Sequence, residues 1–203
     1  MKKIIFLSLV MFSILTACDN KTSKELFDSA EAKSKSNDFE GAIADYDKAI
    51  EKDAKNSQAI FHRGNTKTCI SDFKGAIEDY SMVIKLDPKD GNAYSCRGNS
   101  KKLTGDFAGA IDDFNKAIQN KIKEPAKAYQ LLGYCKLKTN DLPGAQADLD
   151  KAIELNPNLS DAYFLRGELK LKTGVKEEAC ADLAKALELG NKEANDLINK
   201  NCK

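Results

Sequence analysis

Catalysis and metal binding need particular side chains close together in the fold, and this sequence offers few candidates. The single histidine is His62, and no Cys-x-x-Cys pair occurs, so a zinc site is not expected. Adjacent acids at Asp112–Asp113 and Glu177–Glu178 suit general acid–base catalysis by type, but neighbours in a helix point apart and do not converge. Neither a phosphate-binding glycine loop nor a serine-centred nucleophile elbow is present. The sequence therefore predicts a protein that is not an enzyme and that uses no cofactor, metal or small-molecule substrate.

Composition restricts the class of partner. The 203 residues include 32 Lys and Arg against 31 Asp and Glu, which gives a net charge of +1. Binding to nucleic acid through phosphate contacts requires a clear basic excess, so no nucleic-acid partner is expected. Hydrophobic residues make up 42% of the chain, which is enough to build a core.

The amino-terminal segment has the organisation of an export signal. Met1–Lys3 is basic, and Ile4–Leu15 is apolar except for Ser8 and Ser13. Twelve residues are too few to cross a hydrocarbon layer of about 30 Å as a helix. The length is instead that of the apolar region of a signal peptide. Leu15–Cys18 follows directly and reads Leu-Thr-Ala-Cys.

This four-residue box resembles the lipobox of bacterial lipoproteins. The resemblance implies that residues 1–17 are removed and that Cys18 carries fatty acyl chains such as palmitate. It also implies an envelope protein that is lipid-anchored to a membrane and faces away from the cytoplasm, with residues 18–22 as a short linker. An ordinary secretory signal with a nearby cysteine is the alternative.

The rest of the chain repeats with a period of 34 residues. Two glycine series carry the period, and the aromatic or Leu positions follow it. One extra residue lies between Gln119 and Lys127. The series are Gly41, Gly75, Gly109 and Gly144; Gly64, Gly98, Gly133 and Gly167; and Tyr46, Tyr80, Phe114, Leu149 and Leu183. Each unit also shows apolar spacing of three and four residues, which predicts two amphipathic helices.

The pattern of Gly, Ala, aromatic and Pro at set offsets resembles the tetratricopeptide repeat (TPR) family over residues 23–193. The resemblance implies an all-α, right-handed solenoid of five helical hairpins, at about 23–56, 57–90, 91–124, 126–159 and 160–193. Residues 192–203 are expected to form a capping helix. The first unit departs from the pattern with Ala30 at a Gly position, and the fifth ends in Gly190–Asn191 where the pattern has Asp-Pro.

Charged residues also recur in phase. Arg63, Arg97 and Arg166 each lie 18 residues beyond one of the repeated aspartates, and the fourth unit has Leu132 at that position. We expect these charges to join neighbouring units as partly exposed pairs worth about 0.2–1 kcal/mol each. The aspartates are Asp45, Asp79, Asp113, Asp148 and Asp182, and the lysines are Lys33, Lys67, Lys101, Lys136 and Lys170.

The TPR resemblance further implies a concave groove lined by the first helix of each unit. Aromatic and amide side chains there suit an extended peptide, so we expect a protein-binding adaptor or scaffold whose partner is a protein or peptide. The alternative is a structural component of an envelope assembly that uses its convex or edge surfaces. The carboxylate clamp of chaperone-binding TPR domains is not reproduced, because Phe61 and Ser95 stand where a clamp Lys is expected. The expected groove residues are Phe27, Phe61, Asn65, Asn99, Lys102, Gln130, Tyr134, Lys138, Phe164 and Glu168.

Five cysteines remain after Cys18. Cys180 and Cys202 lie at similar distances from a predicted helical turn near Gly190, which makes them candidates for a disulfide, with free thiols as the alternative. Cys69, Cys96 and Cys135 fall at different phases of their units and are expected to be buried free thiols. His62 is expected to be a surface or interface residue.

Overall fold

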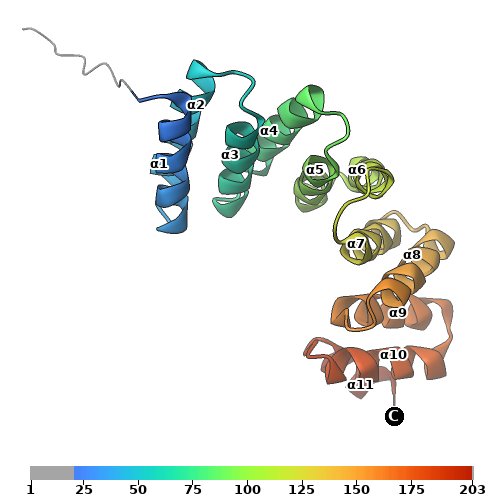
Figure 1. Cartoon of the computed structure of the whole chain (residues 1–203). Helices are drawn as coiled ribbons and strands as arrows, with labels where there is room; N and C mark the ends of the chain where they lie inside the picture. The colour runs from blue at the N-terminus through green and yellow to red at the C-terminus, as the bar shows by residue number, and fades with distance from the viewer. Residues whose placement is uncertain (1–20, 203) are drawn as a thin grey trace, which may run out of the picture.

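Helices are the only regular elements in the computed structural model, which describes residues 21–202. The predicted signal peptide and Cys18 lie outside this range. Successive helix pairs follow one another along an arc from α1 to α11 (Figure 1). The helices are α1 Ser23–Lys35, α2 Phe39–Lys52, α3 Ser57–Cys69, α4 Phe73–Leu86, α5 Gly91–Leu103, α6 Phe107–Gln119, α7 Pro125–Lys138, α8 Leu142–Leu155, α9 Ser160–Thr173, α10 Lys176–Glu188 and α11 Ala194–Asn201.

Contacts between helices follow the order of the chain. Each odd-numbered helix from α1 to α9 packs most extensively against the helix after it, and each pair packs against the next. The first helices of consecutive pairs also touch, from α1 with α3 to α7 with α9. A single hairpin cannot bury its apolar face alone, so stacking of pairs creates the core. The all-helical solenoid expected from the sequence is confirmed.

One glycine series lies in the first turn of the second helix in the first four pairs. At Asp38, Oδ1 accepts a hydrogen bond of 3.1 Å from the backbone N–H of Gly41, and this caps α2. A Cβ at Gly41 would overlap the carboxylate of Asp38, so a larger residue there would displace the cap. The same cap recurs at Asp72 with Gly75, Asp106 with Gly109 and Asp141 with Gly144.

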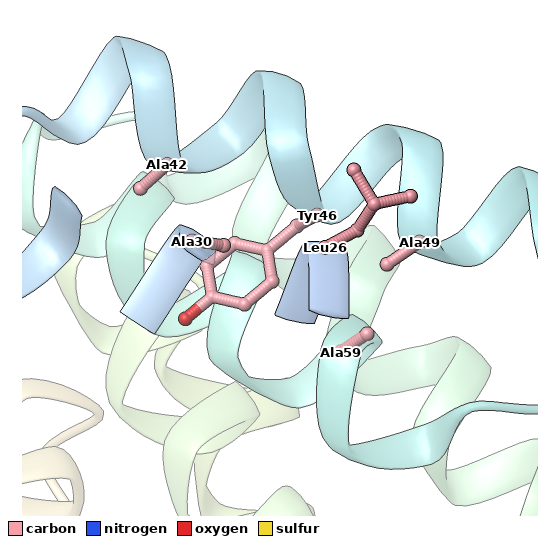
Figure 2. Close-up of a cluster of buried hydrophobic side chains, with 6 residues drawn as sticks. All are labelled: Leu26, Ala30, Ala42, Tyr46, Ala49 and Ala59. Carbon is pink, nitrogen blue, oxygen red and sulfur yellow. The ribbon is translucent and has the colours of Figure 1, made fainter. Parts of the chain in front are cut away.

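The second glycine series explains why a large residue recurs in the second helix. A Cβ at Gly64 would lie 2.9 Å from Cε1 of Tyr80, and one at Gly133 would lie 2.6 Å from Cγ of Leu149. The missing side chain lets the large residue pack on the backbone of the first helix. In the first pair Ala30 takes the glycine position, and the fully buried ring of Tyr46 lies beside it (Figure 2).

The pairing expected for the three arginines is wrong in one respect. Arg63 binds Asp79, which follows it by 16 residues in the same pair, through Nε and Nη2 at 3.0 and 2.5 Å. The helices of a pair are antiparallel, so residues on either side of the turn come level. The remaining Nη1 donates to Asp47 of the preceding pair at 2.6 Å, so the arginine still joins neighbours, through a different residue. Arg97 and Arg166 repeat the arrangement with Asp113 and Ser81, and with Asp182 and Asp150.

The expected exposure of these pairs is also wrong. The side chains of Asp79, Asp113 and Asp182 are only 2%, 3% and 7% exposed. Each also lies 2.8–2.9 Å from the lysine of its own pair. Removing one partner of a buried ion pair leaves an uncompensated charge and costs about 3–5 kcal/mol, well above the value of a surface pair. These buried ion pairs therefore stabilise the packing of the two helices within a pair.

The last helix covers the end of the stack. Ala194 of α11 is buried against Leu183 and Ala186 of α10, and Leu197 and Ile198 pack on the same cluster. In the structure Cys180 and Cys202 are joined by a disulfide, with Cα atoms 5.7 Å apart. Within residues 21–202, no helix has the length and apolar character needed to cross a membrane.

Candidate functional site

A cavity of about 810 Å³ lies on the concave side and is open to solvent. Its walls come from α3, α5, α7 and α9, together with Asn191 and Glu193 from the connection into α11. We call this cavity the groove. Seven of the sequence-predicted residues line it: Asn65, Asn99, Lys102, Gln130, Tyr134, Phe164 and Glu168.

The repeat explains why these side chains meet. Asn65, Asn99, Tyr134 and Glu168 each follow the buried glycine of their helix directly and therefore share one phase. The first helices of successive pairs are in contact, so one phase in sequence becomes one row in space.

Three predicted residues lie elsewhere. Lys138 lines a neighbouring cavity of about 200 Å³ that shares Tyr134 and Glu168 with the groove. Phe61 lies in a separate small cavity beside His62, and Phe27 lines another one near the start of the solenoid. The expected continuous groove is thus concentrated in the second to fifth pairs, with Phe27 and Phe61 outside it.

The amides of the groove differ in how far they are already bonded. Asn65 Oδ1 accepts a hydrogen bond from the hydroxyl of Tyr80 at 2.7 Å, which fixes the side chain. Its NH₂ group makes no hydrogen bond within residues 21–202. Gln130 is 5% exposed, accepts from Lys127 Nζ at 3.1 Å and donates to Asp161 at 3.4 Å. Asn99 makes no side-chain hydrogen bond within the described part of the chain and is half-buried. Gln130 therefore holds the wall together, whereas Asn65 and Asn99 have capacity for a ligand.

Tyr134 lies in the groove with two cations near its ring. Nζ of Lys102 lies 5.7 Å from the centroid of its ring, and Nζ of Lys138 lies 5.2 Å away. The ring edge also contacts Phe107 at 6.2 Å between centroids. Burial lowers the pKa of Lys102 from its ordinary value, with Cys135 opposing this and Lys127 adding to it. The centre of the groove is aromatic and carries positive charge on one side.

The end of the groove nearest α11 is acidic. Asp161, Glu168 and Glu193 all line it, and Lys127 Nζ lies 3.7 Å from Asp161. Dehydration in the concave wall raises the pKa of Glu168; Lys138 lowers it and Glu193 raises it further. Glu168 remains exposed to the open groove, so this dehydration is partial.

Sequence reasoning missed part of the lining. Lys127 and Asp161 lie one helical turn before Gln130 and Phe164 on the same face, a spacing that could have indicated them. Glu193 belongs to the segment treated only as a cap, and no spacing in the sequence relates it to the groove.

The free cysteines do not behave alike. Cys135 is buried, as expected, and Cys96 is half-buried in the groove wall. Burial raises the pKa of each thiol to about 11; Asp90 adds to the effect at Cys96, while a hydrogen bond with Tyr80 opposes it. Both stay protonated at neutral pH and are poor nucleophiles. Cys69 was expected to be buried but is exposed, because it is the last residue of α3.

A second polar cluster joins the first two pairs. Glu31 Oε1 accepts from the hydroxyl of Tyr46 at 2.6 Å and lies 2.7 Å from His62 Nδ1. The ring of His62 contacts Phe27 and Phe61 edge-on. His62 is therefore an interface residue between α1 and α3. Among residues 21–202 no group of three or more metal-ligating side chains is present.

Comparisons with known proteins agree with this geometry. A sequence profile of the tetratricopeptide repeat matches residues 126–159 and 160–192, which hold the fourth and fifth helix pairs. No curated protein sequence shows significant similarity to the chain. The crystal structure of MamA protein is 28% identical with a TM-score of 0.77, and the similarity covers 85% of this chain and 94% of that one.

Two further solved structures share the fold. YrrB, described as a TPR protein with an unusual peptide-binding site, is 22% identical with a TM-score of 0.74, over 86% of this chain and 90% of that one. PilW, described as a widely conserved type IV pilus biogenesis factor, is 20% identical with a TM-score of 0.70, over 85% and 88%. The described chain is therefore an α-solenoid of TPR helical hairpins followed by a short additional helix.

Proposed function

We propose that this protein is a non-catalytic adaptor or scaffold that binds an extended segment of a protein partner in the groove. The observation that carries the proposal is the open cavity of about 810 Å³, whose walls combine the amides of Asn65 and Asn99 with the rings of Tyr134 and Phe164. An extended peptide needs amide partners for its backbone and apolar surface for its side chains, and the groove offers both. YrrB supports the proposal as a protein of the same fold that is described as having a peptide-binding site.

We also propose that Cys18 carries a lipid anchor that holds the solenoid at the outer side of a membrane in the bacterial envelope. The support is the sequence Leu15–Cys18 behind a basic start and an apolar run. Helix α1 begins at Ser23, so residues 18–22 span at most about 17 Å, and the amino-terminal end of the solenoid would be held close to the membrane.

The anchor is tested by Cys18→Ser. The variant should lose incorporation of labelled palmitate and leave the membrane fraction, because the acylated thiol is gone. Phe61→Ala, which leaves Cys18 intact, serves as the control. Normal labelling and fractionation of Cys18→Ser would overturn the proposed anchor.

The binding role is tested by site-specific crosslinking in intact cells. A photoreactive amino acid at Tyr134 should form a defined crosslinked product, because this position faces the groove. The same residue at Lys116, exposed on α6, is the matched control. Products from Lys116 alone would favour the structural alternative, in which partners contact the convex surface. The absence of products from both positions would contradict both roles.

A further inference from the structure

The repeated aspartates buried between the helices are paired with cations, whereas Lys102 in the groove has no such partner. Lys101, its neighbour in sequence, lies 2.8 Å from Asp113. Lys102 is half-buried in the groove, its Nζ lies 5.7 Å from the centroid of the Tyr134 ring, and no carboxylate lies within ion-pair distance of it among residues 21–202. A partly dehydrated cation attracts an anion more strongly than an exposed one does. Lys102 is therefore a free positive group within the groove.

Glu168 is the corresponding free negative group. No cation lies within ion-pair distance of its carboxylate in the described chain, and Glu193 beside it adds negative potential. Lys138 lowers the pKa of Glu168 from a distance, and its Nζ lies 5.2 Å from the centroid of the Tyr134 ring. The groove thus has a cation on α5, an aromatic ring on α7 and an anion on α9.

From this arrangement we infer that the groove selects a peptide with an acidic side chain over Lys102, an apolar or aromatic side chain over Tyr134 and a basic side chain over Glu168. The inference rests on the proposed function and adds the chemistry of the partner to it. Asn65 and Asn99 supply amide groups for the backbone of this peptide. Because the two charged subsites have opposite signs, the peptide binds in one direction only.

The spacing of the two charges follows from helix packing. Helix α5 contacts α7, and α7 contacts α9. Packed helices have axes roughly 8–10 Å apart, and Lys102 reaches toward α7 with its Nζ 5.7 Å from the Tyr134 ring, so the two subsites are at most about 16–20 Å apart. An extended chain advances about 3.3 Å per residue, which places the acidic and basic residues roughly four to six positions apart.

The inference is tested with synthetic peptides, blocked at both ends so that terminal charges do not contribute. Each carries Asp and Arg four to six positions apart, with Leu and Tyr between them, in both orders along the chain. A matched set replaces Asp and Arg with Asn and Gln. Fluorescence anisotropy should show about tenfold tighter binding of the charged peptide in one order than of its neutral equivalent.

Charge exchange identifies the two subsites. Lys102→Glu should weaken binding of the preferred peptide about tenfold and favour a version with Lys in place of Asp. Glu168→Lys should do the same for a version with Asp in place of Arg. Lys116→Glu on α6 and Glu51→Lys on α2, both exposed outside the groove, are the matched controls and should change nothing. Lys102→Gln guards against misfolding of the reversed-charge variant, and thermal melts check all variants.

The outcomes separate the inference from the proposed function. If neutral and charged peptides bind equally and Tyr134→Ala abolishes both, the groove binds peptides but the charge selection is wrong. If charged peptides bind equally in both orders, the assignment of opposite subsites is wrong. If no peptide of any order or spacing binds, both the inference and the proposed function are contradicted.

Discussion

Asp45 in α2 and Asp148 in α8 occupy the same position in the first and fourth helix pairs, and neither has the arginine that binds Asp79, Asp113 and Asp182. In the first pair the arginine position holds Ser29, whose hydroxyl donates to Asp45 at 2.7 Å. In the fourth pair it holds Leu132, which is buried and cannot donate. Each carboxylate has a lysine ammonium at 2.7 Å.

The pKa values of the two carboxylates are shifted in opposite directions. Burial acts to raise the pKa of Asp45, but hydrogen bonds from Lys33 and Ser29 outweigh it and lower that pKa. Burial raises the pKa of Asp148, and the ammonium of Lys136 reverses this only in part. Oδ2 of Asp148 also lacks a hydrogen bond of good geometry within the described chain. The Ser29 hydroxyl and Lys48 help to lower the pKa of Asp45, whereas Asp148 has no hydroxyl donor and has Asp141 nearby, which raises its pKa.

The largest effect is expected when the arginine that binds a buried aspartate is replaced by the leucine of the fourth pair. Arg97→Leu gives the third pair the residue of the fourth and leaves Asp113 buried with Lys101 alone. The free energy of unfolding should fall by about 3 kcal/mol, because a buried charge loses its bidentate partner. Urea unfolding measures the change, with Lys116→Ala as a surface control expected within about 0.5 kcal/mol. A loss below about 1 kcal/mol would mean that lysine alone suffices for this position.

A smaller effect is expected from Ser29→Ala, which makes the first pair resemble the fourth. Asp45 loses the hydroxyl donor while Lys33 remains, so the free energy of unfolding should fall by about 1–2 kcal/mol. The pKa of Asp45, measured by NMR titration, should rise. Ser36→Ala, which removes an exposed hydroxyl that bonds to the backbone, is the matched control. An unchanged pKa would show that Lys33 alone controls Asp45.

The smallest effects should have opposite signs. Asp148→Asn should raise the free energy of unfolding at pH 7 by a few tenths of a kcal/mol, because a raised folded-state pKa makes the ionised form a cost. This gain should vanish as the pH falls below the unfolded value of 3.8. Asp45→Asn should lower stability at pH 7 by up to about 1 kcal/mol, and the loss should disappear as the pH falls through the lowered folded pKa. Urea unfolding at several pH values measures both, and equal signs would contradict the comparison.

Much of the fold could be read from the chain because its signals are local and repeated. The spacing of Gly64, Gly98, Gly133 and Gly167 predicts where two helices approach closely, and the large residue of the partner helix occupies that space. Phe27 and Phe61 were predicted to line one groove with Tyr134, but each lines a separate small cavity, because the units do not contribute equally to one surface.

Spacing along the chain was enough to specify helices, their pairing and the row that faces inward, since each depends on contacts within one unit or with the next. The packed molecule was needed to learn that Arg63 bonds forward to Asp79, that Glu193 joins the groove, and that Lys102 and Glu168 have no ion-pair partner within residues 21–202. These features depend on how side chains from several helices come together around a curved surface. A repeat period carries no information about that curvature or about which charges are left unpaired.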